Sequence, residues 1–542
     1  MDFFKLVVFY QKCFKLITIF NKTMTKIILD CYTDEPAGLG VPPYIGTYPR
    51  YLYGYLKSKA KKENKKDEEI YYLTIDDLRL FLKHGNRKKE TKLHEKTNIT
   101  IHNLTNNSPD IKEIFESLGN HDELYVVLGV HVPGKYLTAM PGTIHEINTL
   151  LKALFKKVHV RGKRILTGPA ATEFGTRLEG GKFAEKQDLS LFNEVIPEIV
   201  KDYDEIAKYS IVGAEIIEQI VNEDGWNYVI AEIETARGCG KGVACSFCTE
   251  PLKNKLEFRK VKDIIDEVKA LNEKKVKYFR LGKQSDFFAW NVSDIKKILS
   301  EIRKNCKIDV LHIDNVDPVR VDEEKVKLVV EHCTSGNIAA LGVESFDTEV
   351  VKRNNLNSTP EVAMKAIKLI NKFGASRGNE DGKEYNGMPK FVPGLNILFG
   401  LIGEGKKTQE ANMKYLSEIL ENDLLLRRIN IRQVAVFPGT QLDEEAGNKF
   451  LRKNKKYYWK WRNAIRQKVD NVMLQKLVPK DLVLKNCIAE IYDGKTTFLR
   501  QIGTYPLVIG VKAKDGKRLE LGKFYNIKVT GHMLRSIVGE IV

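Results

Sequence analysis

Short apolar runs alternate with amphipathic segments along most of the chain. Continuous apolar strands separated by helices are typical of parallel sheets that are covered on both faces. Over residues 24–200 the pattern predicts a doubly wound, Rossmann-like α/β domain. Its apolar runs are KIILDC, IYYLTI, NITIHNL, ELYVVLGV and KVHVRGKRILTG. Ligands of such sheets bind at the carboxyl ends of strands, where DEPAGLGVPPYIG and GVHVPGKYL lie, although neither segment contains G-x-G-x-x-G.

The same alternation resumes over residues 225–445 and predicts a partial (βα)6 barrel. Its six apolar runs are NYVIAEIET, VKYFRLG, DVLHIDN, AALGVES, GLNILFGL and NIRQVAVFPG. Polar residues gather where these runs end, at Asp314, Asn315, Glu344, Ser345, Asn396 and Gln433. In a βα barrel that end of the strands carries the chemistry.

The C-terminal part has two different patterns. Residues 446–480 contain FLRKNKKYYWKWRNAIRQKVDNVMLQK, a basic, aromatic segment that bridges two domains. We favour an amphipathic helix that packs its Tyr and Trp side chains on the barrel, with nucleic-acid contact as the alternative. Residues 481–542 contain short apolar runs with Asp-Gly turns and predict a small β-barrel.

The first 23 residues are an N-terminal extension or the result of a misplaced translation start. Lysines interrupt their apolar stretch, and no small-residue cleavage site follows, so we do not expect a signal peptide. The chain has no charge-free apolar run of about 18 residues, and we therefore expect no membrane span.

The net charge of +17, from 88 Lys and Arg against 71 Asp and Glu, favours a polyanionic partner. Dispersed ion pairs of the kind found in heat-adapted proteins are the alternative explanation for the many lysines. Most of the eight cysteines stand alone, which argues against a disulfide-stapled secreted protein and favours a reducing cytoplasm.

Three cysteines lie together in RGCGKGVACSFC, where Cys239, Cys245 and Cys248 have the spacing C-x5-C-x2-C. Such clustered thiolates indicate a metal site. A structural zinc site needs four ligands, and the chain has no second C-x2-C pair, although Cys306, Cys333 or His332 could supply a fourth ligand after folding. Three thiolates and one open position suit an iron–sulfur cluster better.

The segment ETARGCGKGVACSFCTEP resembles the cluster loop of radical S-adenosylmethionine (SAM) enzymes. The usual spacing there is C-x3-C-x2-C, and the two extra residues here bear mainly on loop geometry. The resemblance implies that Cys239, Cys245 and Cys248 bind three irons of a 4Fe-4S cluster. The fourth iron would bind the amino and carboxylate groups of S-adenosyl-L-methionine.

The resemblance also implies SAM contacts at the ends of the following strands. FRLGKQSDFF lacks the familiar Gly-Gly-Glu, so Phe279 and Gly282 would contact the methionine amino group through the backbone. Glu344 and Ser345 of GVES would bind ribose hydroxyls or the carboxylate. Arg259 matches the basic residue that often follows the cluster loop.

Two later segments extend the same resemblance. GLNILFGLIGE, with Asn396, Gly400 and Glu404, is similar to the fifth-strand glycine motif, in which missing side chains allow close approach of the cofactor. QVAVFPGT, with Val434 and Phe437, is similar to the sixth strand that flanks adenine.

The wider chain resembles an archaeal-type radical SAM family through EPAGLGVPPYIGTYPR, GTIHEINTLL, RRINIRQVAVFPGT and RQIGTYPLVIG. Its N-terminal domain resembles cobalamin-binding or methylthiotransferase domains, and its C-terminal barrel resembles the RNA-binding TRAM domain. These resemblances imply an enzyme that forms a 5'-deoxyadenosyl radical, needs an electron donor and modifies RNA by methylthiolation or methylation.

Three alternatives remain open. Methylthiotransferases carry a second cluster on three N-terminal cysteines, whereas this chain offers only Cys31, with Cys13 in the extension. The second alternative is cobalamin-dependent methylation, or another modification, with a protein as substrate. The Asp-x-His-x-x-Gly loop that binds cobalamin in related domains is absent, and His131 does not stand in such a loop. Some relatives, however, bind cobalamin without that histidine. The third is an RNA-binding protein with a structural metal knuckle and no catalysis.

Overall fold

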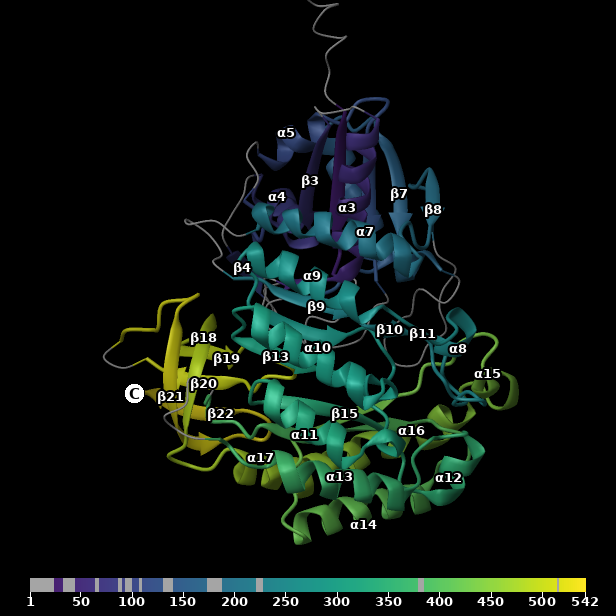
Figure 1. Ribbon diagram of the computed structural model, residues 1–542, viewed down its shortest axis with the longest axis vertical. Coiled ribbons are helices and arrows are strands. Elements are labelled where there is room, and N and C mark those ends of the chain that lie inside the picture. The colour runs from purple at the N-terminus through teal and green to yellow at the C-terminus, as the bar shows by residue number, and fades with distance from the viewer. Residues whose placement is uncertain are drawn as a thin grey trace, which may run out of the picture.

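The computed structural model shows three parts, an N-terminal sheet, a central open barrel and a small C-terminal barrel (Figure 1). The residues that it describes are 24–32, 44–63, 68–85, 90–92, 100–106, 110–129, 140–172, 188–220, 228–378, 385–513 and 516–542. Residues 1–23, including Cys13, lie outside them. No helix among the described residues is both long enough and apolar enough to cross a bilayer.

The N-terminal sheet has the strand order β3-β1-β6-β7-β8, and all its strands are parallel. This order confirms the doubly wound fold, because it is the 2-1-3-4-5 order of flavodoxin-like sheets. The strands are β1 (Thr25–Asp30), β3 (Glu69–Thr74), β6 (Glu123–Val127), β7 (Lys163–Thr167) and β8 (Glu194–Ile196). The ligand crevice of such a sheet opens between β1 and β6, but the loops predicted there, with His131, lie mostly outside the described residues.

Helices cover both faces of this sheet, as its apolar strands require. Side chains of α3 pack on one face with Ile28 and Val127, and side chains of α4, α5 and α6 pack on the other with Ile27 and Val126. The helices are α3 (Thr47–Lys62), α4 (Ile75–His84), α5 (Ile111–Glu116) and α6 (Ile144–Lys157), and α7 (Tyr203–Gly213) packs on α3. A capping box begins α4, where Thr74 and Asp77 satisfy each other's backbone N–H groups.

The central part is a curved, open barrel of parallel strands in chain order, which the pairing divides into two four-stranded sheets. The strands are β9 (Ile230–Glu234), β12 (Tyr278–Gly282), β13 (Val310–Ile313) continued by β14 (Asn315–Val316), β15 (Asn337–Glu344), β16 (Phe391–Phe399) and β17 (Arg428–Gln433). Outside it lie α9 (Val261–Glu273), α10 (Val292–Asn305), α11 (Glu323–His332), α13 (Pro360–Gly374) and α14 (Lys406–Glu421). The short strand β2 (Tyr44–Ile45), from the N-terminal domain, pairs with β9 and extends this sheet.

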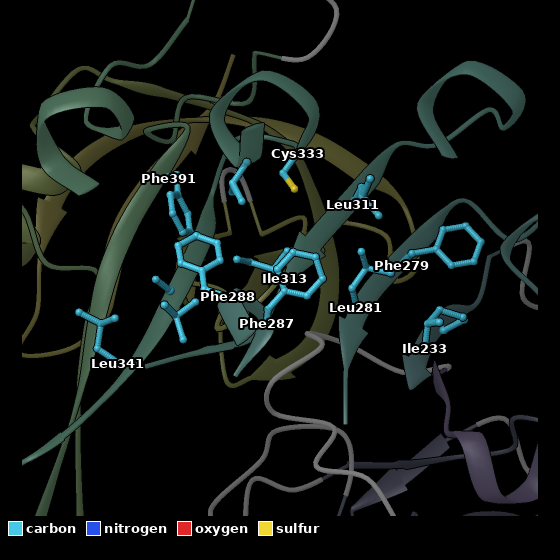
Figure 2. Packing of buried hydrophobic residues seen from close by; sticks show 14 of the residues in the cluster. Ile233, Phe279, Leu281, Phe287, Phe288, Leu311, Ile313, Cys333, Leu341 and Phe391 are labelled. Atoms are coloured by element: carbon cyan, nitrogen blue, oxygen red, sulfur yellow. The ribbon is translucent and has the colours of Figure 1, made fainter. Parts of the chain in front are cut away.

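Strand alternation sorts the side chains of the central sheet into two sets. Ile233, Phe279, Leu281, Leu311 and Ile313 point into the apolar layer beneath the helices (Figure 2). The residues between them point to the concave interior, and these include Glu232, Arg280, His312, Asp314, Asn396 and Arg428. The interior of the barrel is therefore polar and charged.

The basic bridge folds into α16 (Lys449–Ile465), a π-helical turn η5 (Arg466–Asp470) and α17 (Asn471–Leu477). Trp461 is buried and stacks on Phe399 of β16, as the packed amphipathic helix requires. Trp459, by contrast, is 62% exposed. The helix thus packs one aromatic side chain on the barrel and leaves another in solvent.

The C-terminal residues form a closed five-stranded barrel, as predicted. Its strands are β18 (Val483–Asp493), β19 (Thr496–Gln501), β20 (Ile509–Lys512), β22 (Ile537–Ile541) and β21 (Phe524–His532). The loop between β19 and β20 reaches into the central barrel, where Thr504 contacts His312 and Tyr505 contacts Asp314. One wall of the central barrel therefore comes from the C-terminal domain.

Candidate functional site

The cysteine loop begins at the carboxyl end of β9, after β10 (Ala236–Arg237), which pairs with β11 (Glu257–Phe258). Gly238 has φ +78°, and a Cβ there would lie 2.2 Å from the carbonyl oxygen of Lys255. Its N–H donates to Oε1 of Glu250 at 2.9 Å. Only glycine fits this close backbone crossing, which explains the Arg-Gly-Cys order.

Ser246 fixes the middle of the loop to the rest of the barrel. Its N–H donates to the carbonyl oxygen of Asn354 at 2.9 Å, and its hydroxyl donates to Oδ1 of the same residue at 2.7 Å. The Ser246 carbonyl accepts the N–H of Leu442 at 2.7 Å. The three cysteines, each half-buried, are thus held on an anchored loop.

Burial shapes the chemistry of the thiols. It raises the pKa of Cys245 to about 11 and also raises the pKa of Cys248, while Nζ of Lys241, 3.6 Å from Sγ of Cys245, opposes the shift at Cys245. Metal binding removes these protons, because thiolate is the ligand form. The positive charge of Lys241 favours that form.

Three thiolates on one loop fit an iron–sulfur cluster with one open iron. A closed structural zinc site would need a fourth ligand. Cys306 and Cys333 follow α10 and α11 and so precede strands, whereas the cysteine loop follows a strand. Cys306 and Cys333, considered from the sequence as a fourth zinc ligand, thus lie at the end of the sheet opposite the cysteine loop. Cys333 is also packed among apolar side chains (Figure 2).

Glu344 ends β15, the place that the resemblance assigns to a SAM contact. It occupies a left-handed conformation with φ +57°, at a bulge in the β15–β16 pairing. Burial, with a smaller contribution from Asp317, raises the pKa of this carboxyl to about 8. The side chain of Ser345 instead accepts the N–H of Asp347 at 3.1 Å and is fully buried.

At the end of β12, Gly282 faces the interior, and a Cβ there would lie 2.4 Å from Oε1 of Glu232. The Phe279 side chain is 1% exposed and packs beneath the helices, away from the interior. Its backbone lies in β12, which is paired with β9 and β13. The structure therefore brings Gly282 to the site but directs the side chain of Phe279 elsewhere, because the two positions have opposite strand parity.

Residues in and just after β16 and β17 face the barrel interior or pack against the support of the cysteine loop. Asn396 faces the interior, where its Oδ1 accepts from Nδ2 of Asn430 at 3.0 Å. Gly400, with φ +100°, donates its N–H to the buried carboxyl of Glu404, whose pKa is raised to about 8 by burial. Val434 is buried in an apolar cluster that also touches Cys245 and so supports the cysteine loop. Phe437 is half-buried, and its carbonyl accepts from the hydroxyl of Thr440 at 2.6 Å.

Arg259 contacts no cysteine in the hydrogen-bond network. It is 1% exposed, and its Nη1 lies 2.6 Å from Oε2 of Glu267, whose other oxygen lies 2.6 Å from Nη2 of Arg50. Nη1 of Arg259 also donates to the carbonyl oxygen of Glu234 at 2.8 Å. Arg259 thus fixes the end of β9 to the N-terminal domain, so its role in the structure is to position the strand from which the cysteine loop emerges.

Residues 233–382, which include the cysteine loop, match the model of the radical SAM superfamily. The chain belongs to this superfamily. It is also 37% identical over 561 residues to the uncharacterized protein MJ0274 of Methanocaldococcus jannaschii, covering 95% of this chain and 93% of that protein, and the two form one family. This radical SAM protein is therefore an enzyme, and its cofactors are a 4Fe-4S cluster and S-adenosyl-L-methionine. The alternative of a non-enzymatic metal knuckle is wrong.

Two further similarities are more distant. The ribosomal protein uS12 methylthiotransferase RimO of Clostridioides difficile is 22% identical over 363 residues, which cover 64% of this chain and 75% of that protein. Among solved structures, the radical SAM methyltransferase TsrM of Kitasatospora setae, with cobalamin and a 4Fe-4S cluster bound, has a TM-score of 0.46 and 14% identity. It covers 78% of this chain and 77% of its own.

Sequence reasoning found Asp314 but missed its charged partners in the interior of this radical SAM barrel. Arg280 forms an ion pair with Asp314, and its other terminal nitrogen lies 3.8 Å from Glu232. The hydroxyl of Tyr505, from the C-terminal barrel, lies 3.4 Å from Oδ1 of Asp314. Strand alternation could have found Glu232 and Arg280, because each occupies an inward position between two apolar ones. No local signal marks Tyr505.

Proposed function

We propose that this enzyme forms a 5'-deoxyadenosyl radical and uses it to modify RNA, by methylation or methylthiolation. A bound 4Fe-4S cluster would supply the one-electron chemistry that converts SAM into methionine and that radical, with a donor protein as the source of the electron. Cys239, Cys245 and Cys248 would hold the cluster, while Gly282 and Glu344 would border the SAM position. The surrounding barrel excludes water from the radical.

One observation carries the choice of RNA: α16 presents an exposed basic and aromatic surface beside the radical SAM barrel. Its sequence, KFLRKNKKYYWKWRNAI, has seven Lys and Arg and no Asp or Glu. Trp459 is 62% exposed, Tyr457 is 41% exposed, and Cζ of Arg462 lies 5.1 Å from the Trp459 ring centroid. Single-stranded nucleic acid binds such surfaces, because bases stack on the rings while cations neutralise phosphates.

The C-terminal barrel supports the same proposal. We assign it as TRAM-like, an RNA-binding barrel, from its five closed strands and the resemblance of its sequence. Its β19–β20 loop contacts the interior of the radical SAM barrel through Thr504 and Tyr505. An RNA bound on this domain would therefore lie next to the chamber in which the radical forms.

The transfer chemistry is better supported for methylation than for methylthiolation of the usual form. The similarity to RimO favours sulfur transfer and also favours a protein substrate as the main alternative to RNA. A second, sulfur-donating cluster would need further thiolates in the N-terminal domain. Cys31, the one cysteine among that domain's described residues, is fully buried, and burial raises its pKa far above that of a free thiol.

A cobalamin-dependent methyltransferase is the second candidate, and the doubly wound N-terminal sheet favours it. The junction of this sheet with the radical SAM barrel, where Thr167 ends β7 and Glu234 ends β9, has an internal space of only about 20 Å³, which admits a water and not a corrin. Burial raises the pKa of the Glu198 carboxyl there to about 7. Cobalamin would instead bind at the carboxyl end of the sheet between β1 and β6, where such sheets bind their ligands.

The proposal is tested on anaerobically reconstituted, dithionite-reduced protein. Electron paramagnetic resonance with and without SAM is recorded, and 5'-deoxyadenosine is assayed after addition of total RNA or of ribosomal protein. We expect a cluster signal that shifts with SAM, and 5'-deoxyadenosine formation stimulated by RNA. Stimulation by protein alone would overturn the RNA substrate, and the absorbance spectrum after incubation with hydroxocobalamin decides the second candidate.

A further inference from the structure

Four arginines meet at the junction of the radical SAM barrel, η5 and the C-terminal barrel. Arg427 and Arg428 stand at the start of β17, Arg466 begins η5, and Arg535 lies in the turn between β21 and β22. Asp470 forms an ion pair with Arg466 and lies 4.0 Å from Nε of Arg535. We call these four residues the arginine cluster.

Positive charge in the arginine cluster is only partly neutralised. Among the described residues, the largest electrostatic effects on Arg427 and Arg535 come from neighbouring arginines and from one carboxylate, Asp470. Burial, together with these neighbouring guanidinium groups, lowers the pKa of Arg427 to about 9 and that of Arg535 to about 10. An anion placed here would gain from several guanidinium groups at once.

One guanidinium of the arginine cluster also has an unused donor. Arg466 is 4% exposed, its Nη1 donates to the carbonyl oxygen of Ile429 at 2.6 Å, and its Nε has no hydrogen-bond partner among the described residues. A buried donor without a partner costs about 1–3 kcal/mol. An oxyanion is the kind of ligand that would satisfy this donor and the surplus charge together.

Arg428 connects the arginine cluster to the radical SAM chamber. Its Cζ lies 4.0 Å from the Tyr505 ring centroid, and Nη2 of Arg427 donates to the Tyr505 carbonyl oxygen. Arg428 also lines a cavity inside the barrel, and the other lining residues are Ile338, Ala340, Gly394, Leu395, Asn396, Asn430 and Tyr505. The space inside this cavity is only about 10 Å³, room for about one water and too little for a nucleobase. Arg428 therefore stands between the arginine cluster and a closely packed part of the barrel interior.

We propose that the arginine cluster binds a backbone phosphate of single-stranded RNA. The choice of RNA rests on the proposed function. The exposed surface of α16 continues toward the same place, since Arg462, beside Trp459, is among the residues whose charge acts on Arg535. The bound RNA strand would stack its bases on α16, pass through the arginine cluster and reach the chamber.

The test measures binding of a fluorescein-labelled oligouridylate of about 12 nucleotides to the holoenzyme across a salt series. Arg535→Gln removes one exposed cation of the cluster, and Arg518→Gln removes an exposed cation elsewhere on the same barrel. Because each neutralised phosphate of a single strand contributes about 0.7 to the salt slope, we expect R535Q to lower the slope by about 0.7 and affinity by roughly tenfold. R518Q should leave both at the wild-type values.

The outcomes separate this inference from the proposed function. If the wild type binds the RNA and R535Q binds with the same slope and affinity, the phosphate site is wrong and an RNA substrate still stands. If the wild type does not bind RNA, both are overturned, and a protein substrate replaces them. Unfolding midpoints of both variants, measured in parallel, show whether any loss of binding comes from misfolding. A loss of RNA binding in R535Q without a change in its unfolding midpoint supports the site.

Discussion

Thr504 donates its backbone N–H to Nδ1 of His312 at 2.9 Å, although the two residues are 192 positions apart in the chain. The Thr504 hydroxyl lies 3.1 Å from the same nitrogen. A Cβ on the preceding residue, Gly503, would lie 2.8 Å from the His312 ring. This contact joins the C-terminal barrel to the interior of the radical SAM barrel, and it requires neutral imidazole, because Nδ1 must accept.

Acid should therefore weaken this contact. Burial lowers the pKa of His312 to about 4, well below its value of about 6.5 in an unfolded chain. The unfolded state binds the extra proton first, so the stabilising contribution is complete above pH ~6.5 and is lost as pH falls toward ~4, by about 3 kcal/mol. Urea-unfolding midpoints measured at several pH values in this window should fall accordingly.

His312→Asn is the matched control for that prediction. Its amide oxygen can accept at the position of Nδ1, and the side chain does not titrate. The variant should lose less stability than the wild type between pH ~6.5 and ~4. Parallel losses in the two proteins would show that another group causes the acid sensitivity.

Glu267→Gln should destabilise the fold strongly. Its carboxylate is the shared partner of Arg50 and Arg259, and all three side chains are fully buried, so the change leaves two guanidinium groups without a counter-charge. We expect a loss of about 3–5 kcal/mol in the free energy of unfolding. Asp266→Asn on the same helix removes the solvent-exposed ion pair with Lys262 and should cost at most about 1 kcal/mol. Equal effects would contradict a central role for the buried pairs.

Alanine at Cys239, Cys245 or Cys248 should abolish the cluster and leave the fold intact. Changes near a metal ligand typically cost about 10–100-fold in affinity or activity, so loss of a ligand should cost more than about 100-fold. Iron content and 5'-deoxyadenosine formation are the measurements. Cys306→Ala, at the end of α10, should retain both. Retention of iron in all three loop variants would disprove the ligand assignment.

Gly238→Ala should prevent cluster assembly through the backbone alone. Alanine strains the left-handed conformation by about 1–2 kcal/mol, and its Cβ would meet the Lys255 carbonyl. We expect reconstituted protein with little iron. Gly242→Ala, in the same loop, meets no heavy atom within 4 Å and should assemble normally. A fully loaded G238A protein would mean that the loop can re-form without the crossing seen here.

Trp459→Ala should weaken RNA binding by about 1–3 kcal/mol, the usual value of one stacked base. Fluorescence anisotropy with the labelled oligouridylate measures the change. Ile211→Ala, at a residue 47% exposed on α7, controls for loss of an exposed apolar group. If W459A binds as tightly as the wild type, α16 is not the RNA surface.

The radical SAM loop and most strands could be recognised in the sequence because they depend on local signals. Two strands differ from the expectation. NITIHNL was expected in the doubly wound sheet, but its strand β5 (Thr100–His102) pairs antiparallel with β4 (Glu90–Lys92) in a separate sheet, and the edge strand β8 has no long apolar run. Phe279 shows what strand alternation adds to a motif. The resemblance assigns it a backbone contact with the cofactor, and alternation places its side chain beside Leu281 in the apolar layer.

The remaining features depend on contacts between distant segments. Nothing around Tyr505 indicates that it faces Asp314, and nothing around Arg50 indicates that it pairs with Glu267. Trp459 and Trp461 differ by two positions in one helix, so the sequence pattern did not tell which of them packs on Phe399. Long-range packing decided each case.

Because β2 pairs with β9, the N-terminal part and the central barrel share one sheet and are not independent folding units. Tyr44 and Ile45 pair with Ile230 and Ala231, and Arg50 donates to the carbonyl oxygens of both Ile45 and Glu232. A shortened chain that begins near residue 225 would leave β9 as an unprotected edge strand, which invites intermolecular pairing and aggregation. The strand that leads into the cysteine loop is therefore protected from aggregation by an N-terminal segment. Excising the central barrel alone would remove that segment.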